Sequence, residues 1–380
     1  MDTYLKQNQY EMICMSMKCD VLVVGAGPAG LSATLHLSNM GFSTIVIEKN
    51  ENVGPKFTEY DITEGTRIYK ILNELDIKPN KISPISEWIS QNHSYILHSK
   101  IEDYYFKRGP EKDSLEHVLL KKLNENYASV YFKSKVDSIK LKEKEIVEVE
   151  VETDIKKIKI KPKYVIVADG ADSDFRRRLK VETKKFAKFN GFGVLIKSNE
   201  NEIIPHAKIY FDEKIAPGGY IYSGSVDKEA FFCIITDDIF NKKKSQKQHL
   251  KHFLELRLKG EFTIKNYFGG TGASGIQEVI VGNAILIGGA SLLCDPFLGY
   301  GLNYAIESAY FATIAIEKNN FGIYAKYVNK IHQEIKDMFF AREIWRKVNN
   351  KFFDRLIMAF NGEYDTSNEQ INKILDLFRE

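Results

Sequence analysis

CDVLVVGAGPAG, at residues 19–30, is the stretch of sequence that decides the fold. Its first half is an apolar run that predicts a buried strand, and residues 28–40 have the pattern of a helix. Residues 43–47 form a second apolar run, which closes with Glu48. Together these segments predict a β-α-β unit, in which two parallel strands are joined by a right-handed crossover.

The glycines of this stretch predict a dinucleotide site. Gly25 allows a tight turn, Gly27 lets the backbone approach a pyrophosphate, and Gly30 lets the helix pack closely on the strand. The helix then presents free N–H groups and the positive end of its dipole. An acid about 20 residues further on, Glu48, is placed to accept hydrogen bonds from the adenosine ribose. The candidate residues here are Gly25, Gly27, Ala29, Gly30, Glu48 and Lys49.

Composition excludes several classes of function. A formal net charge of +3 over 380 residues gives no electrostatic reason to expect nucleic acid as a partner. Four scattered cysteines without a C-x-x-C pair support neither a disulfide framework nor a metal site. The N-terminus lacks the pattern of a signal peptide, and no apolar run reaches the ~18 residues of a membrane span. We therefore expect a cytoplasmic protein, with peripheral contact to a membrane left open.

Strand and helix patterns divide the rest of the chain. Alternation at 136–141 and 146–151 predicts a β-meander, and residues 184–267 alternate like a mostly antiparallel sheet with one helix near 246–258. The C-terminal segment is helical, aromatic and basic, which fits either packing on the body of the protein or contact with an anionic lipid surface.

The expected fold class follows from these patterns. It is α/β, with a Rossmann-like dinucleotide-binding domain that contains a β-meander, a mostly antiparallel β-sheet substrate domain, and a helical C-terminus. The length allows roughly two or three domains. The first strand is expected to begin near residue 18. The expected boundaries are 18–80, 100–183 and 275–318 for the first domain, 81–99 and 184–274 for the second, 319–380 for the C-terminal segment, and 1–17 for a flexible extension.

Two later turns bear on which dinucleotide is bound. Ala168-Asp169-Gly170 follows an apolar strand at 164–168 and resembles the "DG" motif of flavoproteins with the para-hydroxybenzoate hydroxylase fold, although an isolated Asp-Gly pair would be an ordinary turn. Residues 284–303 resemble the "GD" motif of that group and the P-x-x-G-x-G turn that opens a helix after it, except that Gly289 replaces the aspartate. The resemblance implies FAD, with the helix facing the N1–C2=O edge of the flavin. The residues implied are Asp169, Gly170, Gly289, Pro296, Gly299, Tyr300, Gly301, Leu302 and Asn303.

Two further cofactor residues are implied by the same resemblance. Arg108, before a helix expected over 111–126, is similar to an arginine that reaches the ribitol and phosphates, with a solvent-exposed role as the alternative. Val136 stands where the backbone of these flavoproteins meets the adenine.

Within this group the chain resembles the geranylgeranyl reductases. The three FAD motifs occur in the order of that family, the C-terminal tail is helical, and residues 217–224 resemble its P-x-x-Y-x-W-x-F-P motif. Tyr220 is retained, whereas Tyr222 replaces the tryptophan. A cysteine-containing turn of many members is absent, and residues 55–58 stand near its place.

The resemblance implies a reductase that saturates double bonds of isoprenoid chains. Tyr220 and Tyr222 are the candidate catalytic residues, proposed from their position as proton donors, and we expect them to line an apolar channel with Phe192, Phe211 and Phe297. The electron donor is either NADPH or reduced ferredoxin. A flavin monooxygenase or halogenase of the same fold is one alternative, although no W-x-W-x-I-P segment is present. An impaired flavin protein that binds lipid without turnover is the other.

Overall fold

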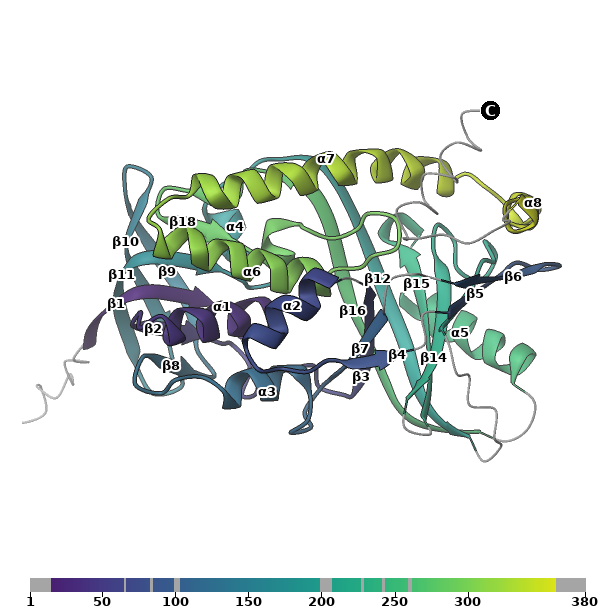
Figure 1. The fold of residues 1–380 in the computed structure, drawn as a ribbon, viewed down its shortest axis with the longest axis horizontal. Coiled ribbons are helices and arrows are strands. Elements are labelled where there is room, and N and C mark those ends of the chain that lie inside the picture. The colour runs from purple at the N-terminus through teal and green to yellow at the C-terminus, as the bar shows by residue number, and fades with distance from the viewer. Residues whose placement is uncertain are drawn as a thin grey trace, which may run out of the picture.

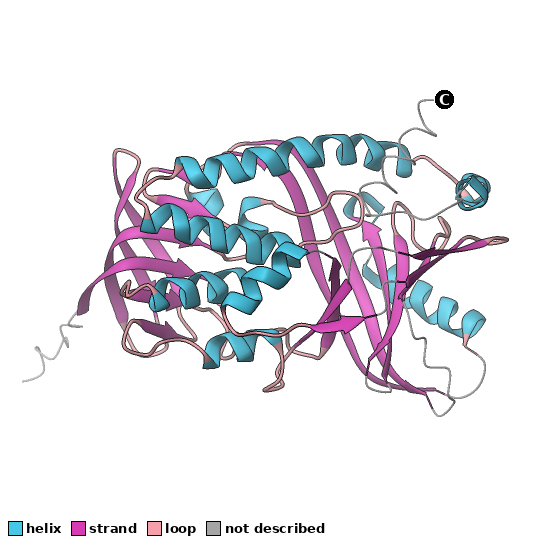
Figure 2. Ribbon diagram, viewed as in Figure 1, coloured by secondary structure: helices cyan, strands magenta, loops and turns pink. Residues whose placement is uncertain are grey.

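The computed structural model describes residues 15–64, 66–82, 85–98, 103–198, 207–226, 229–240, 243–258 and 262–359. In this part of the chain there are two large sheets and one small one. Figure 1 shows the two large sheets at opposite ends of the molecule, with the small sheet between them. Most of the helices gather over the half that holds the first large sheet (Figure 2). The predicted α/β fold class is confirmed.

The first sheet carries the parallel strands. Its path is β17-β18-β11-β1-β2-β8, in which β18, β11, β1, β2 and β8 run parallel. The predicted meander, β9 and β10, continues from β11 in antiparallel fashion. The strands are β1 (Met15–Val24), β2 (Thr44–Ile47), β8 (Ala128–Tyr131), β9 (Lys135–Lys142), β10 (Glu145–Glu152), β11 (Lys157–Val167), β17 (Ile280–Val281) and β18 (Ala284–Leu286).

The predicted β-α-β unit is confirmed by β1, α1 (Pro28–Asn39) and β2. Residues 29–38 of α1 are buried, because α3 (Leu115–Lys121) and α6 (Leu302–Glu317) pack against that helix. α7 packs on α6 in turn. The other helices are α2 (Thr66–Glu74), α4 (Asp174–Arg178), α5 (Lys243–Arg257), α7 (Gly322–Trp345), α8 (Asn350–Ala359), and the short 3₁₀ turns η1 (Asp238–Phe240) and η2 (Gly288–Ser291).

The second large sheet is antiparallel except for one pair of strands. Its order is β16-β12-β15-β14-β13-β5-β6, and only β13 and β5 run parallel among these neighbours. The small sheet has the order β3-β7-β4. The strands are β3 (Glu59–Glu64), β4 (Asn80–Ile82), β5 (Ile85–Ile89), β6 (Ser94–His98), β7 (Asp103–Arg108), β12 (Thr183–Ser198), β13 (Ala207–Tyr210), β14 (Tyr220–Val226), β15 (Glu229–Asp237) and β16 (Phe262–Gln277).

The first strand begins earlier than the sequence predicts. β1 starts at Met15 rather than near residue 18, and 15–19 pair with 158–162 of β11. β11 is itself longer than the expected run at 164–168, because alternate residues such as Ile158 and Ile160 are buried and extend the strand backwards. Residues 15–17 therefore belong to the sheet and not to an extension. The rest of the predicted extension lies outside the described residues.

One helical prediction changes, and an alternative left open for the C-terminal segment is decided for most of its aromatic residues. The helix expected over 111–126 is limited to α3, with Ser114 as its N-cap residue. In the C-terminal segment the aromatic stripe packs inward, since Phe339, Trp345 and Phe353 are buried, while Phe340 is exposed. The sequence also contains Thr366-x-x-Glu369, a capping-box pattern that predicts a last short helix, but these positions lie outside the described residues.

Candidate functional site

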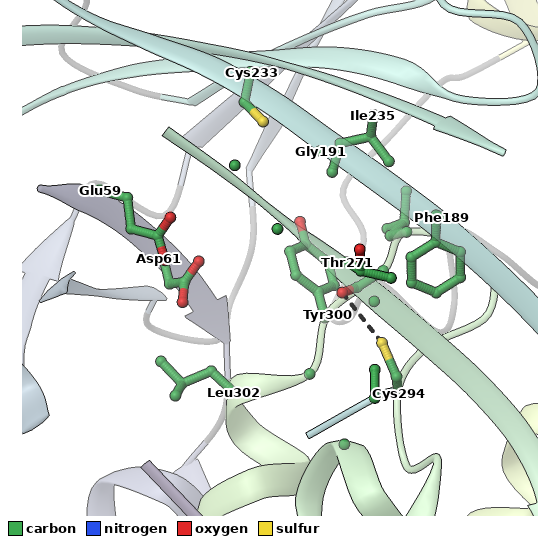
Figure 3. Close-up of a pocket in the computed structure, with 18 of the residues that line it drawn as sticks. Glu59, Asp61, Phe189, Gly191, Cys233, Ile235, Thr271, Cys294, Tyr300 and Leu302 are labelled. Atoms are coloured by element: carbon green, nitrogen blue, oxygen red, sulfur yellow. Dashed lines mark hydrogen bonds between the residues drawn. The ribbon is translucent and has the colours of Figure 1, made fainter. Parts of the chain in front are cut away.

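A cavity of about 400 Å³ lies between the parallel sheet and the inner face of the antiparallel one. The first sheet contributes the turns that follow its strands, and α6 contributes its N-terminus. The opposite wall is formed by β12, β14, β15 and β16, and β3 and β7 of the small sheet close one side. Figure 3 shows side chains from these elements converging on the cavity.

The turn at 25–30 has the geometry that its glycines predict. Gly25 has a φ of +104°, and a Cβ on Gly30 would lie 1.9 Å from the Gly25 carbonyl oxygen. The helix can therefore start this close to the strand only with glycine at position 30. A Cβ on Gly27 would meet nothing within 4 Å, and no side chain caps α1, so the space beside Gly27 is open and the start of α1 is left without a side-chain acceptor.

Glu48 holds this turn in place. Its Oε2 accepts a hydrogen bond from the Ala26 N–H at 2.8 Å, and its Oε1 accepts from the backbone and side-chain N–H groups of Asn50. The carboxylate is buried, whereas the neighbouring Lys49 is exposed. A carboxylate has about four acceptor positions, so these bonds leave capacity for a ribose hydroxyl. The roles of Glu48 and Lys49 toward a ribose stay predictions.

The turn at 169–171 lies against the turn at 288–289. Asp169 accepts the Phe175 N–H with Oδ2 at 3.0 Å, while its buried Oδ1 has no partner. A Cβ on Gly289 would lie 2.8 Å from the Ala171 nitrogen. The aspartate that the flavoprotein motif has at this position would therefore force the two turns apart. The close approach of the turns explains the glycine in physical terms.

The N-terminus of α6 is held open toward the cavity. Asp295 accepts the N–H groups of Phe297 and Leu298 with Oδ1 and so fixes the loop before the helix. No side chain caps α6, its first turn carries no acid, and the buried Oδ1 of Asn303 has no partner. Of the residues predicted here, the cavity is lined by Gly170, Gly289, Gly299, Tyr300, Gly301 and Leu302.

We call the turns at 25–30, 169–171, 288–289 and 299–303 the glycine-rich edge. Two uncapped helix N-termini suit anionic phosphate and the polar edge of a flavin. The unpartnered oxygens of Asp169 and Asn303 are acceptors for the hydroxyl groups of a ribitol or ribose. The residues present at this edge therefore fit FAD.

Arg108 lines the cavity, and its guanidinium group is paired with carboxylates. Its Nη1 lies 2.6 Å from Asp61 Oδ2 and 3.7 Å from Glu59 Oε1, and its Nε lies 2.7 Å from Glu116 Oε1. Its side chain is 19% exposed, so the solvent-exposed alternative is wrong. Contact with the ribitol or phosphates of FAD stays a prediction. Val136, the other residue implied by the resemblance, is buried in β9.

The apolar wall contains both predicted tyrosines. Tyr220 and Tyr222 line the cavity, and the Tyr220 hydroxyl donates to the Leu298 carbonyl. Burial raises the pKa of both hydroxyls well above its usual value. Phe192, Phe211 and Phe297 do not line this cavity. Phe211 and Phe297 pack on Trp345, and Phe192 stacks on Tyr267 on the other face of its strand. The aromatic residues that do line the cavity are Phe189, Tyr220, Tyr222, Phe268 and Tyr300.

Two carboxylates that sequence reasoning missed also line the cavity. Glu59 and Asp61 stand two residues apart on β3 and so project from the same face of the strand. Burial raises the pKa of the Glu59 carboxyl to about 7, with the Arg108 charge acting in the opposite direction. The signal in the sequence was the acidic alternation itself, which does not distinguish a solvated edge strand from a cavity wall.

Neither a membrane-spanning helix nor a metal cluster is found among the described residues. None of the helices found there has the length and apolar character needed to cross a bilayer. Within the same residues, no cluster of three or more His, Cys, Asp or Glu side chains has the arrangement of a metal site.

Comparison with known proteins agrees with this geometry. The family profile "FAD binding domain" matches residues 101–317, and the profile "FAD dependent oxidoreductase" matches 20–171. A digeranylgeranylglycerophospholipid reductase of Thermoplasma volcanium is 26% identical over 95% of this chain and 91% of its own length. The resemblance to geranylgeranyl reductases predicted from the motifs is confirmed.

Solved structures show the same fold. A geranylgeranyl bacteriochlorophyll reductase-like protein of Thermoplasma acidophilum has a TM-score of 0.81 at 22% identity, covering 95% of this chain and 96% of its own. The p-nitrophenol 4-monooxygenase of Pseudomonas putida has a TM-score of 0.71 at 16% identity, covering 96% and 98%. At these identities the likeness concerns the fold alone.

Proposed function

This chain belongs to the FAD-binding domain family and is an FAD-dependent oxidoreductase, and from that premise we propose that it saturates carbon–carbon double bonds of isoprenoid chains in membrane lipids. The observation that carries the proposal is a single cavity with two unlike walls. One wall is the glycine-rich edge, and the other is an aromatic and aliphatic sheet face. The relative from Thermoplasma volcanium, a digeranylgeranylglycerophospholipid reductase, supports the choice of substrate class.

We propose the following division of roles at the glycine-rich edge. The N–H groups at the start of α1 and the turn at Gly27 hold the pyrophosphate, and Glu48 accepts from the adenosine ribose. Asp169 and Asn303 accept from ribitol hydroxyls, and the N-terminus of α6 meets the polar edge of the flavin ring. Bound FAD, once reduced, supplies the hydride that adds to one carbon of the double bond.

The apolar wall has to position an unactivated alkene and exclude water. Such an alkene is a poor hydride acceptor, so close approach in a dry site is required. Phe189, Phe268 and Ile235 supply apolar surface for an isoprenoid chain. Tyr220 and Tyr222 border the same space, and their roles near the reaction stay part of the proposal. The Tyr220 hydroxyl already donates to Leu298, which makes it a poor source of a proton.

The electron donor and the contact with a membrane are also part of the proposal. The electrons come from NADPH or reduced ferredoxin, and the lipid substrate requires at least peripheral contact with a membrane. The likeness to p-nitrophenol 4-monooxygenase keeps a flavin monooxygenase as the second candidate. That candidate predicts a different use of the reduced flavin, namely reaction with oxygen in the presence of an aromatic substrate.

The test uses the full chain with bound FAD, reduced by dithionite under argon. Geranylgeranyl-bearing phospholipid in detergent is then added, while absorbance follows the flavin and mass spectrometry follows the lipid. We expect the lipid to gain pairs of hydrogens as the oxidised flavin bands return. Unchanged lipid beside persistently reduced flavin would contradict the proposal. Rapid reoxidation in air with hydroxylation of an aromatic compound would favour the monooxygenase instead.

A further inference from the structure

Saturating an alkene needs a proton as well as a hydride, and the small sheet offers an acid for that purpose. Glu59 and Asp61 of β3 both line the cavity, and Glu59 is the register partner of Arg108 on β7. Figure 3 shows the two carboxylates projecting from β3 toward the space bordered by Cys233 and Tyr300. They are acidic groups on the wall of a cavity whose opposite face is apolar.

The three carboxylates around Arg108 are not equally paired. Asp61 and Glu116 accept hydrogen bonds from the guanidinium at 2.6 and 2.7 Å. Glu59 lies 3.7 Å from the same Nη1 atom that Asp61 engages. Glu59 is therefore the carboxylate that Arg108 stabilises least by direct contact.

The charges in this cluster do not balance when all groups are ionised. Three carboxylates surround one guanidinium, and the side chains of Glu59 and Glu116 are only 16% and 0% exposed. Burying uncompensated like charges is unfavourable, so such a group takes up a proton instead. The proton is expected on the least paired carboxylate that borders the cavity, which is Glu59.

We propose that Glu59 is the catalytic residue that protonates the second carbon of the alkene, and that Asp61 and Arg108 are positioning residues: the negative charge of Asp61 favours the protonated form of Glu59, and Arg108 holds Asp61 in place. This role rests on the proposed alkene reduction. In each cycle the π bond breaks and two C–H bonds form. The reduced flavin, replenished by NADPH or ferredoxin, provides two electrons and one hydrogen as hydride, and the Glu59 carboxyl provides the other as a proton. The resulting carboxylate regains a proton from water.

The groups that face Glu59 agree with this role. They are Asp61 on the same strand, Arg108 on β7, Glu116 on α3, Tyr222 on β14 and Cys233 on β15. Burial raises the pKa of the Tyr222 hydroxyl and of the Cys233 thiol well above their usual values, which makes both weak acids. The pKa of Glu59, at about 7, matches the operating range of a general acid at neutral pH.

The first experiment measures a single turnover of the prereduced holoenzyme with geranylgeranyl phospholipid. Glu59→Gln should slow lipid-dependent flavin reoxidation roughly 100-fold or more, while Glu59→Asp recovers part of the rate. The wild-type rate should fall as pH rises through the neutral range, and Glu59→Gln should lose that dependence. Glu150→Gln on the meander, at a position that does not line the cavity, is the matched control and should behave like wild type.

The second readout needs no turnover. Infrared difference spectra of the protein between pH 5 and pH 9 should contain the C=O band of a protonated carboxyl, and Glu59→Gln should remove it. A Glu59→Gln variant with normal rate and an unchanged band would overturn the role of Glu59 and leave the proposed function intact. A wild-type protein that never reduces the lipid would instead overturn the proposed function, and this role with it.

Discussion

The two walls of the cavity use different parts of the chain. On the parallel-sheet side the groups that face the cavity are mostly backbone: helix N-termini and turns such as those at Pro28, Gly170 and Gly301. On the antiparallel side they are largely side chains of long strands, such as Phe189, Tyr222 and Phe268, together with the glycine-containing stretch 269–272 of β16. The first wall depends mainly on where glycine occurs, and the second depends mainly on which side chain occupies each place.

This difference sets how each wall tolerates change. A backbone-lined site fails when a side chain intrudes, because the backbone atoms it would meet cannot move aside without shifting a strand or a helix. A wall of side chains changes its shape gradually, since each residue alters only the volume near itself. Substitutions on the two walls should therefore differ sharply in their effect on flavin binding.

The largest effect is expected from Gly30→Ala. The added methyl group would lie 1.9 Å from the Gly25 carbonyl oxygen, so the turn has to open. We expect the purified variant to carry almost no FAD, measured by absorbance at the flavin bands. Gly270→Ala on the opposite wall is the matched control, because its Cβ would meet nothing within 4 Å, and it should keep its flavin. Equal flavin content in the two variants would contradict the expectation that substitutions on the two walls differ in their effect on flavin binding.

Asp237→Asn tests the connection between the second sheet and α7. Asp237 at the end of β15 and Arg342 on α7 are each 1% exposed and lie 2.9 Å apart, and Arg346 also reaches the carboxylate at 2.6 Å. Removing the charge leaves a guanidinium buried without its counter-ion, which typically costs about 3–5 kcal/mol. Urea unfolding should show this loss. Lys251→Met, which removes an exposed i,i+4 pair on α5, should change stability by only about 0.3–0.5 kcal/mol.

Gly289→Asp restores the aspartate of the flavoprotein motif and should nevertheless lower both the folding stability and the affinity for FAD. Because its Cβ would press on the Ala171 nitrogen, we expect a loss of about 1–3 kcal/mol in stability together with weaker FAD binding. Thermal unfolding with and without added FAD measures both. Tighter FAD binding in this variant would mean that the ribitol contact outweighs the crowding of the two turns.

Glu59→Gln gives the smallest expected effect on stability among these site variants, and the size of that effect depends on pH. The folded-state pKa of about 7 lies above the ordinary value of 4.5, so the folded protein binds more protons than the unfolded chain between these values. Stability therefore falls as pH rises through this window, because ionising Glu59 in place becomes a cost. At pH 8 the variant should be more stable than wild type by on the order of 1–2 kcal/mol, and at pH 4 the two should coincide. Melting curves across this range would contradict the assignment if the difference were independent of pH.

The wall that can be predicted from sequence is the one made of backbone. Gly25, Gly30 and the P-x-x-G-x-G turn have spacings that local geometry requires, so a short motif was enough to predict the β-α-β unit and its ligand class. The same reasoning flagged Gly289 as a departure from the motif. Only the structure supplies its cause, because the contact with Ala171 joins residues that are distant in the chain.

The other wall could not be predicted in the same way. Phe192 and Phe189 look alike in sequence, yet the facing direction of β12 places Phe189 on the cavity and Phe192 on the opposite face. Glu59 and Asp61 lie in an acidic strand of ordinary appearance, and their burial depends on Arg108 and Glu116, some 50 residues later in the chain. Long-range packing of this kind leaves no local pattern.

The loop before α6 is fixed from three directions. Asp295 accepts its N–H groups, Tyr220 donates to the Leu298 carbonyl, and Arg342 donates to the Phe297 carbonyl. The first anchor is local, but the others come from β14 of the antiparallel sheet and from α7. A long lipid therefore has to enter the cavity without separating the two large sheets. Moving the sheets apart would break the hydrogen bonds that Tyr220 and Arg342 make to this loop. Replacing Tyr220 or Arg342 should therefore loosen a loop that belongs to the cofactor side of the cavity, so a change made to the lipid side also affects cofactor binding.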